Sequence, residues 1–182
     1  MLQFEKTNIE GLFVISPHIH EDQRGILKKV YERQAFAEQG INFQVYEELE
    51  TTSKFGVLRG LHFQTEHAQG KLIRVAKGKL QDVAVDVRKG SKTLGQHFSI
   101  ELSQENRKML FLPEGLAHGC LALEDNTTFY YLCTQPYCPG YDSGIYWNDK
   151  DLNIIWQLNE KDIIVSDKDQ NLQSFQEYLS GK

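Results

Sequence analysis

Cysteine and long apolar runs are scarce in this 182-residue sequence, and each scarcity excludes a class of protein. Three cysteines (Cys120, Cys133 and Cys138) are too few, and odd in number, for a disulfide framework. No apolar run approaches the roughly 20 residues that a membrane-spanning helix needs. The first residues also lack a basic region followed by an apolar stretch, which a secretory signal requires. We therefore expect a cytoplasmic protein without membrane attachment.

A strong charge of either sign is also missing. Lysine and arginine total 20 and aspartate and glutamate total 25, which gives a net charge of −5. A mildly acidic chain without a cluster of basic residues is a poor candidate for binding nucleic acid or an anionic membrane. No repeat, low-complexity segment or Pro/Gly/Ser-rich linker divides the chain. We expect a single domain over residues 1–182.

Most of the sequence has the pattern of short β-strands. Within Leu80–Val87, three valines at alternating positions predict a strand with one apolar face. Similar runs are Phe43–Leu49, Val57–Phe63, Leu72–Val75, His97–Leu102, Lys108–Leu112 and Thr127–Leu132. Helical patterns are confined to Glu32–Gln39 and to about Asp169 to Leu179. Many short strands and few helices predict an all-β sandwich or barrel with a few short peripheral helices.

Residues 56–71 hold the densest group of polar candidates. In a strand here, His62 and Gln64 share a face with Gly60, whereas Arg59 lies on the other face. Polar groups beside a missing side chain are typical of a strand that lines a ligand cavity. Arg59 and His62 can reach one ligand only if the strand kinks or bulges at Gly60. A buried core histidine beside a surface arginine is the alternative interpretation.

A second polar stretch follows at residues 112–119, where Pro113 and Gly115 predict a tight turn and His118 lies on the next strand. The two stretches resemble the paired motifs of the cupin superfamily, which implies a double-stranded β-helix barrel of the jelly-roll type. The metal ligands of that superfamily would fall on His62, Gln64, Gln69 and His118. Neutral amides bind transition metals weakly, so we expect no metal.

Nearly the whole chain resembles the dTDP-4-dehydrorhamnose 3,5-epimerase family. Eight segments match in order and spacing: Asp22–Gly25, Gly56–Gln64, Gln69–Arg74, Asp82–Arg88, Pro113–Gly119, Tyr131–Tyr137, Trp147–Asp149 and Ser166–Asp169. The resemblance implies a cupin-type isomerase acting on a nucleotide-linked 4-keto-6-deoxyhexose, without a metal or other cofactor. It also implies a place in dTDP-rhamnose and polysaccharide biosynthesis.

Epimerisation beside a ketone needs a base, an acid on the opposite face of the ring, and a cation or donor at the ketone oxygen. The resemblance implies that His62 is the base and that Asp169 orients its imidazole. It further implies Lys71 at the developing oxyanion and Tyr131 as the acid. Taken alone, Asp169 would be a helix N-cap, Tyr131 a core aromatic residue and Lys71 a surface lysine.

The resemblance also implies a set of residues that bind the nucleotide and the sugar: Arg24, Arg59, His118, Tyr137, Asp142 and Lys168. Tyr137 would stack on the base, and Asp142 stands where the family usually has glutamate. Surface charges are the alternative for Arg24 and Lys168, and residues 22–25 have the composition of an ordinary turn.

Three positions depart from the family pattern, with Lys29 in place of a glutamate and Glu47 and Leu49 in place of amides. One consequence would be an altered preference, such as a single-position epimerase acting at C3 or C5 of a CDP-linked sugar. Alternatively, the exchanged charges pair with each other and preserve the usual substrate. A metal-dependent cupin enzyme and a catalytically silent sugar-binding barrel are further alternatives.

The family is dimeric and exchanges N-terminal strands across the interface, so the resemblance implies a homodimer. The apolar residues Leu12–Ile15 suit that use, although a monomer could bury them equally well.

Overall fold

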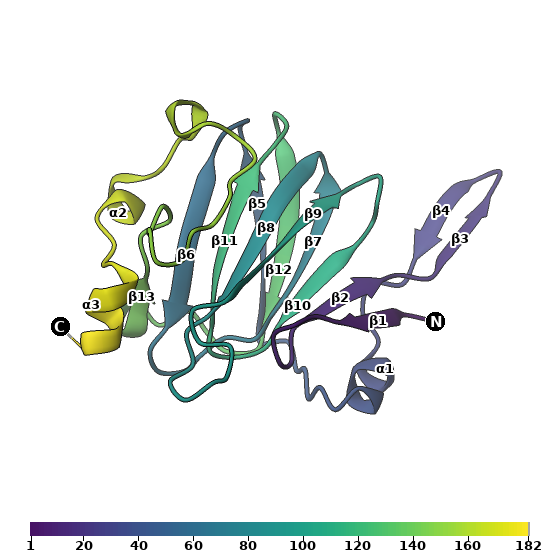
Figure 1. Cartoon of the computed structure of the whole chain (residues 1–182). Helices are drawn as coiled ribbons and strands as arrows, with labels where there is room; N and C mark the ends of the chain where they lie inside the picture. The colour runs from purple at the N-terminus through teal and green to yellow at the C-terminus, as the bar shows by residue number, and fades with distance from the viewer. Residues whose placement is uncertain (182) are drawn as a thin grey trace.

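The computed structural model describes residues 1–181 and contains two antiparallel sheets that face each other (Figure 1). The first sheet runs β1 (Gln3–Lys6), β2 (Phe13–Ser16), β10 (Met109–Leu112), β7 (Lys71–Lys77), β12 (Thr127–Cys133) and β5 (Glu47–Ser53). The second runs β13 (Asp142–Gly144), β6 (Leu58–Gln64), β11 (Leu116–Ala122), β8 (Lys79–Asp86) and β9 (His97–Ser103). This arrangement confirms the predicted all-β class of jelly-roll type.

A hairpin of β3 (Ile19–Asp22) and β4 (Gly25–Lys28) projects from the barrel near the N-terminus (Figure 1). These two strands, β1, β2 and β13 lie outside the predicted runs, and β11 is the strand expected to carry His118 after the turn at Pro113 and Gly115. The strand expected over Phe43–Leu49 begins only at Glu47, because Phe43 is buried against the helix that precedes it. The other predicted runs agree with observed strands to within two residues at each end.

The helices are short and peripheral. α1 (Arg33–Glu38) lies within the predicted Glu32–Gln39, whereas the single helix predicted in the tail is wrong. That region forms α2 (Asp167–Gln170) and α3 (Phe175–Ser180), and Ser174 caps the second of them. Between them, Gln173 forms a β-bridge with Ile145, which interrupts the helical pattern. Two 3₁₀ turns, Pro139–Tyr141 and Glu160–Asp162, complete the elements, and no helix within residues 1–181 is long and apolar enough to cross a membrane.

Apolar side chains fill one part of the space between the sheets and leave another part to polar groups. On β7, the inward positions Ile73 and Val75 are buried in the core, and on β12 Phe129 joins them. Further along the same inward faces, towards the start of β7 and the end of β12, the side chains become polar. The outer faces are covered by α1 and its neighbours on the first sheet and by the C-terminal segment on the second.

A β-bulge in β6 decides which of its side chains point inward. His118 of β11 lies opposite His62, and Cys120 lies opposite Arg59. Between these two pairs β6 advances three residues and β11 only two, so β6 contains one extra residue. The extra residue brings Arg59 to the same side as His62, which confirms the condition expected from the sequence. Gly60, within the bulge, has φ +122°, and a Cβ there would lie 2.5 Å from the backbone oxygen of His118.

We predict that Gly60→Ala lowers the free energy of unfolding by about 2–4 kcal/mol, because the methyl group meets backbone that cannot move aside. The matched control is Gly140→Ala, since a Cβ at Gly140 would meet no atom within 4 Å. Urea unfolding of both variants measures the difference. Equal stability of the two variants would contradict this account of the bulge.

Candidate active site

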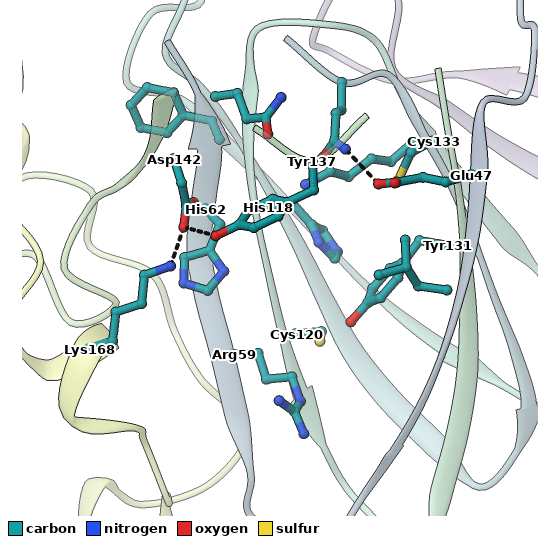
Figure 2. A pocket seen from close by; sticks show the side chains of 15 residues that line it. Glu47, Arg59, His62, His118, Cys120, Tyr131, Cys133, Tyr137, Asp142 and Lys168 are labelled. Carbon is teal, nitrogen blue, oxygen red and sulfur yellow. Dashed lines mark hydrogen bonds and ion pairs between the residues drawn. The ribbon is translucent and has the colours of Figure 1, made fainter. Parts of the chain in front are cut away.

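A cavity of about 200 Å³ opens between the two sheets, and both sheets contribute side chains to it (Figure 2). The sequence-predicted residues that line it are Arg59, His62, Lys71, His118, Tyr131, Tyr137, Asp142 and Lys168. His62 and Tyr131 come from opposite sheets, on β6 and β12 respectively. Asp169 lies directly behind His62 and is buried. Of the predicted site residues, nine therefore gather at one place.

Asp169 holds His62 in position. Its Oδ1 lies 2.7 Å from Nε2 of His62, and its Oδ2 accepts a hydrogen bond of 3.1 Å from the backbone N–H of Gly60. Burial alone would raise the pKa of Asp169, but the hydrogen bond and charge of His62 and the Gly60 N–H outweigh it and lower that pKa. The N-cap interpretation of Asp169 is wrong, because Ser166 caps α2 instead. Nδ1 is the ring nitrogen of His62 that this contact leaves unused.

Tyr131 and Lys71 lie on neighbouring strands of the opposite sheet. Burial raises the pKa of Tyr131, which keeps the phenol protonated at neutral pH. Desolvation lowers the pKa of Lys71, and within residues 1–181 no group forms a hydrogen bond or ion pair with its ammonium. An ammonium without a protein partner in a cavity is a binding group for a ligand oxygen. Lys71 is therefore not the surface lysine of the alternative interpretation, whereas Tyr131 both lines the cavity and packs against the apolar core.

His118 has a carboxylate partner that sequence reasoning missed. Its Nε2 lies 3.1 Å from both carboxylate oxygens of Asp82, and both residues are buried. Asp82 lies on β8, a strand that is buried on both faces. A charged residue inside such a strand is the sequence feature from which a buried partner could have been predicted. A charged residue in such a strand needs a partner, which His118 supplies.

Three side chains form a network at the rim of the cavity. The Tyr137 hydroxyl donates to Oδ2 of Asp142 at 2.8 Å, and the Lys168 ammonium forms an ion pair with the same oxygen (Figure 2). Burial would raise the pKa of Asp142, but Lys168 and Tyr137 together lower it, while the contact with Asp142 raises the pKa of Lys168. Tyr137 is 52% exposed, so its aromatic side chain is accessible to a planar ligand.

The positions that depart from the family pattern divide into two groups. Glu47 and Leu49 line the cavity, and Glu47 accepts a hydrogen bond of 3.1 Å from the amide of Gln69. Lys29 instead forms an ion pair of 3.0 Å with Glu32, outside the cavity. The expectation that the exchanged charges pair with each other is therefore wrong within one chain.

Arg24 is the predicted site residue that the structure does not bring to the cavity of its own chain. It lies in the turn between β3 and β4, its side chain is 85% exposed, and its guanidinium pairs with Asp22 at 2.6 Å. Its assignment to substrate binding stays a prediction. Arg59, by contrast, lines the cavity and donates from Nε to the hydroxyl of Ser53 at 3.2 Å.

The two amides at cupin metal-ligand positions are engaged by the backbone. The Gln64 side chain donates to the carbonyl oxygens of His67 and Pro136 and accepts from the N–H of Cys138. The Gln69 side chain donates to the carbonyl oxygen of Gln135 as well as to Glu47. In the described part of the chain, no three His, Cys, Asp or Glu side chains are grouped as metal ligands.

Comparison with known proteins identifies the family. A family model described as dTDP-4-dehydrorhamnose 3,5-epimerase matches residues 6–177. The chain belongs to the dTDP-4-dehydrorhamnose 3,5-epimerase family. A relative of that name from Methanothermobacter thermautotrophicus is 46% identical over 176 residues, which cover 96% of this chain and 95% of the relative. The predicted family resemblance is thus confirmed.

Two solved structures of family relatives contain sugar nucleotides. The dTDP-6-deoxy-D-glucose-3,5-epimerase from Legionella pneumophila, in complex with dTDP-4-keto-L-rhamnose, has a TM-score of 0.92 at 36% identity and covers 96% of this chain and 93% of its own. A 3′-monoepimerase from Streptomyces bikiniensis, in complex with dTDP-quinovose, has a TM-score of 0.90 at 31% identity, with coverage of 96% and 89%.

The His62–Asp169 contact predicts a pH-dependent share of stability. A carboxyl group whose pKa is lowered on folding stabilises the fold above its unfolded pKa of about 3.9, and this stabilisation is lost as the pH falls through the folded value. We expect Asp169→Asn to be less stable than the wild type by about 1–3 kcal/mol at pH 7. The difference should shrink as the pH falls below about 4. Urea unfolding from pH 7 to 3 measures it, and a difference independent of pH would contradict the ion pair.

Proposed function

We propose that this chain is a dTDP-4-dehydro-6-deoxy-D-glucose 3,5-epimerase. The observation that carries the proposal is the arrangement of His62 and Tyr131 on facing sheets of one cavity, which the Lys71 ammonium, without a partner among the described residues, also lines. Family membership across residues 6–177 supports the reaction class. The sugar nucleotide bound by the Legionella pneumophila enzyme supports the substrate class.

Each step of the reaction has a residue suited to it. Nδ1 of His62 takes the proton from C3 or C5, and the carboxylate of Asp169 stabilises the imidazolium that forms. The electron pair moves onto the C4 oxygen, where the Lys71 ammonium offsets the developing negative charge. Tyr131 then gives a proton to the same carbon from the opposite face of the ring, which inverts the configuration.

The remaining lining residues serve the rest of the substrate. Arg59 and Lys168 offer the cations that a diphosphate requires, and the exposed ring of Tyr137 offers a stacking face for the base. His118, whose Nε2–H donates to the Asp82 carboxylate, has Nδ1 left to accept a hydrogen bond from a hydroxyl of the sugar. The family resemblance supports the cytoplasm as the site of the reaction and polysaccharide synthesis as its purpose.

Variants that lack the base and variants that lack the acid are expected to lose different parts of the reaction. In deuterated water, His62→Asn should reduce exchange of the C3 and C5 hydrogens by about a thousandfold, because no base remains. Tyr131→Phe should retain exchange and lose inversion, because His62 can return a solvent-derived deuteron only to the face from which it took the proton. NMR of the sugar nucleotide reports both quantities.

The matched control for the histidine variant is His67→Asn, since His67 is exposed and lies outside the cavity. It should behave as the wild type. Absence of exchange with every 4-keto-6-deoxy sugar nucleotide offered to the wild type would contradict the proposed function.

A single-position epimerase is the second candidate, and Glu47 and Leu49 in the cavity wall favour it. Both replace amides of the family pattern, so the hydrogen-bonding character around the ligand differs. The structural similarity to a 3′-monoepimerase supports the same candidate. Sugars linked to thymidine, cytidine, uridine and guanosine diphosphates, with the deuterated carbon identified for each, distinguish the two candidates.

We also propose that the chain acts as a homodimer in which Arg24 reaches the substrate bound to the second copy. The hairpin that carries Arg24 points away from the barrel and exposes the apolar residues Ile26 and Leu27 by 47% and 71% (Figure 1). A two-stranded hairpin is marginally stable in water unless another surface covers it. A second copy would cover the hairpin and receive the guanidinium.

Complementation tests this assembly. Light scattering should give about twice the 21.0 kDa of one chain. Arg24→Ala and His62→Asn should each lose most activity, and co-expressed chains of both variants should regain it, because one site in the mixed dimer is intact. A monomer, or mixed dimers without regained activity, would contradict the exchange.

A further inference from the structure

The inward face of β5 presents two hydroxyl groups to the residues of the cavity. The side chains of Glu47 and Leu49 line the cavity, and Thr51 and Ser53 follow on the same face because alternate residues of a strand point the same way. Ser53 is buried and accepts the hydrogen bond from Nε of Arg59. Thr51 donates from its hydroxyl to the Tyr131 oxygen at 3.4 Å.

The pairing of β5 with β12 fixes this contact. Leu49 lies directly opposite Tyr131, and Thr51 lies opposite Phe129. Thr51 is therefore the diagonal neighbour of Tyr131 on the inward face, a distance that a long aromatic side chain spans. The Tyr131 ring packs edge-on against Phe129 and His118, so both its ring and its oxygen have fixed neighbours.

A buried tyrosine that gives up a proton needs a partner for the charge it acquires. The ring neighbours of Tyr131 offer no hydrogen bond to a phenolate oxygen, and burial raises the free energy of that anion. Within residues 1–181, the hydroxyl of Thr51 is the hydrogen-bond donor placed at the Tyr131 oxygen. The positive charge of Arg59 favours the anion from farther away.

We propose that Thr51 is a positioning residue for the acid step, in which its hydroxyl aims the Tyr131 oxygen and stabilises the phenolate. This inference rests on the proposed function. The Tyr131 O–H bond breaks, its electron pair stays on the oxygen, and the proton forms the new C–H bond as the C4 carbonyl returns. The phenolate then takes a proton from water, and the His62 imidazolium releases one.

Loss of the Thr51 hydroxyl should therefore affect only the return of the proton. Proton removal depends on His62 and Asp169, which belong to the other side of the cavity. If the acid step slows, the intermediate more often regains a solvent-derived hydron from the imidazolium on its original face. The ratio of inversion to hydrogen exchange should then fall, while KM stays the same.

The test compares four variants in deuterated water with dTDP-4-dehydro-6-deoxy-D-glucose. Thr51→Val and Thr51→Ala remove the hydroxyl, and Thr51→Ser retains it. Thr52→Val is the matched control, because Thr52 is the next residue of the strand, points outward and bonds to the hydroxyl of Thr128. Thermal unfolding checks that each variant folds. Because two variants lack the hydroxyl, the test still works if one of them does not fold. NMR measures inversion and exchange in the same sample.

We expect the ratio of inversion to exchange to fall about tenfold in the two hydroxyl-free variants, as loss of a hydrogen bond to a charged group predicts. Thr51→Ser and Thr52→Val should keep the wild-type ratio. A wild-type ratio in the hydroxyl-free variants, or a proportional fall of inversion and exchange, would overturn the role of Thr51. Failure of the proposed function is distinguishable, because the wild type itself would then show no exchange.

Discussion

The contact between His62 and Asp169 is the interaction on which the rest of the site depends. It joins a strand of the second sheet to a four-residue helix 107 positions further along the chain. A carboxylate at this depth is stable only if donors meet both of its oxygens, and His62 and the Gly60 N–H do so. The bulge at Gly60 supplies that N–H and also turns Arg59 inward. One local irregularity thus serves the base, its partner and a candidate phosphate ligand.

The groups needed for the proposed reaction come from both sheets. The second sheet carries the base, whose buried carboxylate partner comes from α2, whereas the first sheet carries the acid and the ammonium proposed for the ketone oxygen. In the proposed reaction, a sugar ring between the sheets would therefore be approached from opposite faces, as epimerisation requires. The apolar core beside the cavity fixes the separation of the two groups, because close-packed side chains do not let the sheets slide.

Much of this arrangement could be predicted from the sequence, and the omissions have physical reasons. Alternating valines identified β8, and the family motifs identified His62, Lys71 and Tyr131, which line one cavity. Asp82 was missed because pairing with His118 depends on strand register, which local patterns do not show.

The other differences also come from long-range contacts. The tail helix is interrupted by a bridge between Gln173 and Ile145, residues far apart in the sequence. The proposed role of Arg24 depends on an assembly of two chains, which the sequence pattern of its own hairpin does not encode.

A crystal structure with an unreactive analogue of the 4-keto sugar nucleotide tests the central claim most directly. The account predicts the pyranose ring between Nδ1 of His62 and the Tyr131 oxygen, one on each face, with the C4 oxygen at Lys71. A sugar bound outside this cavity, or with both groups on one face, would contradict it.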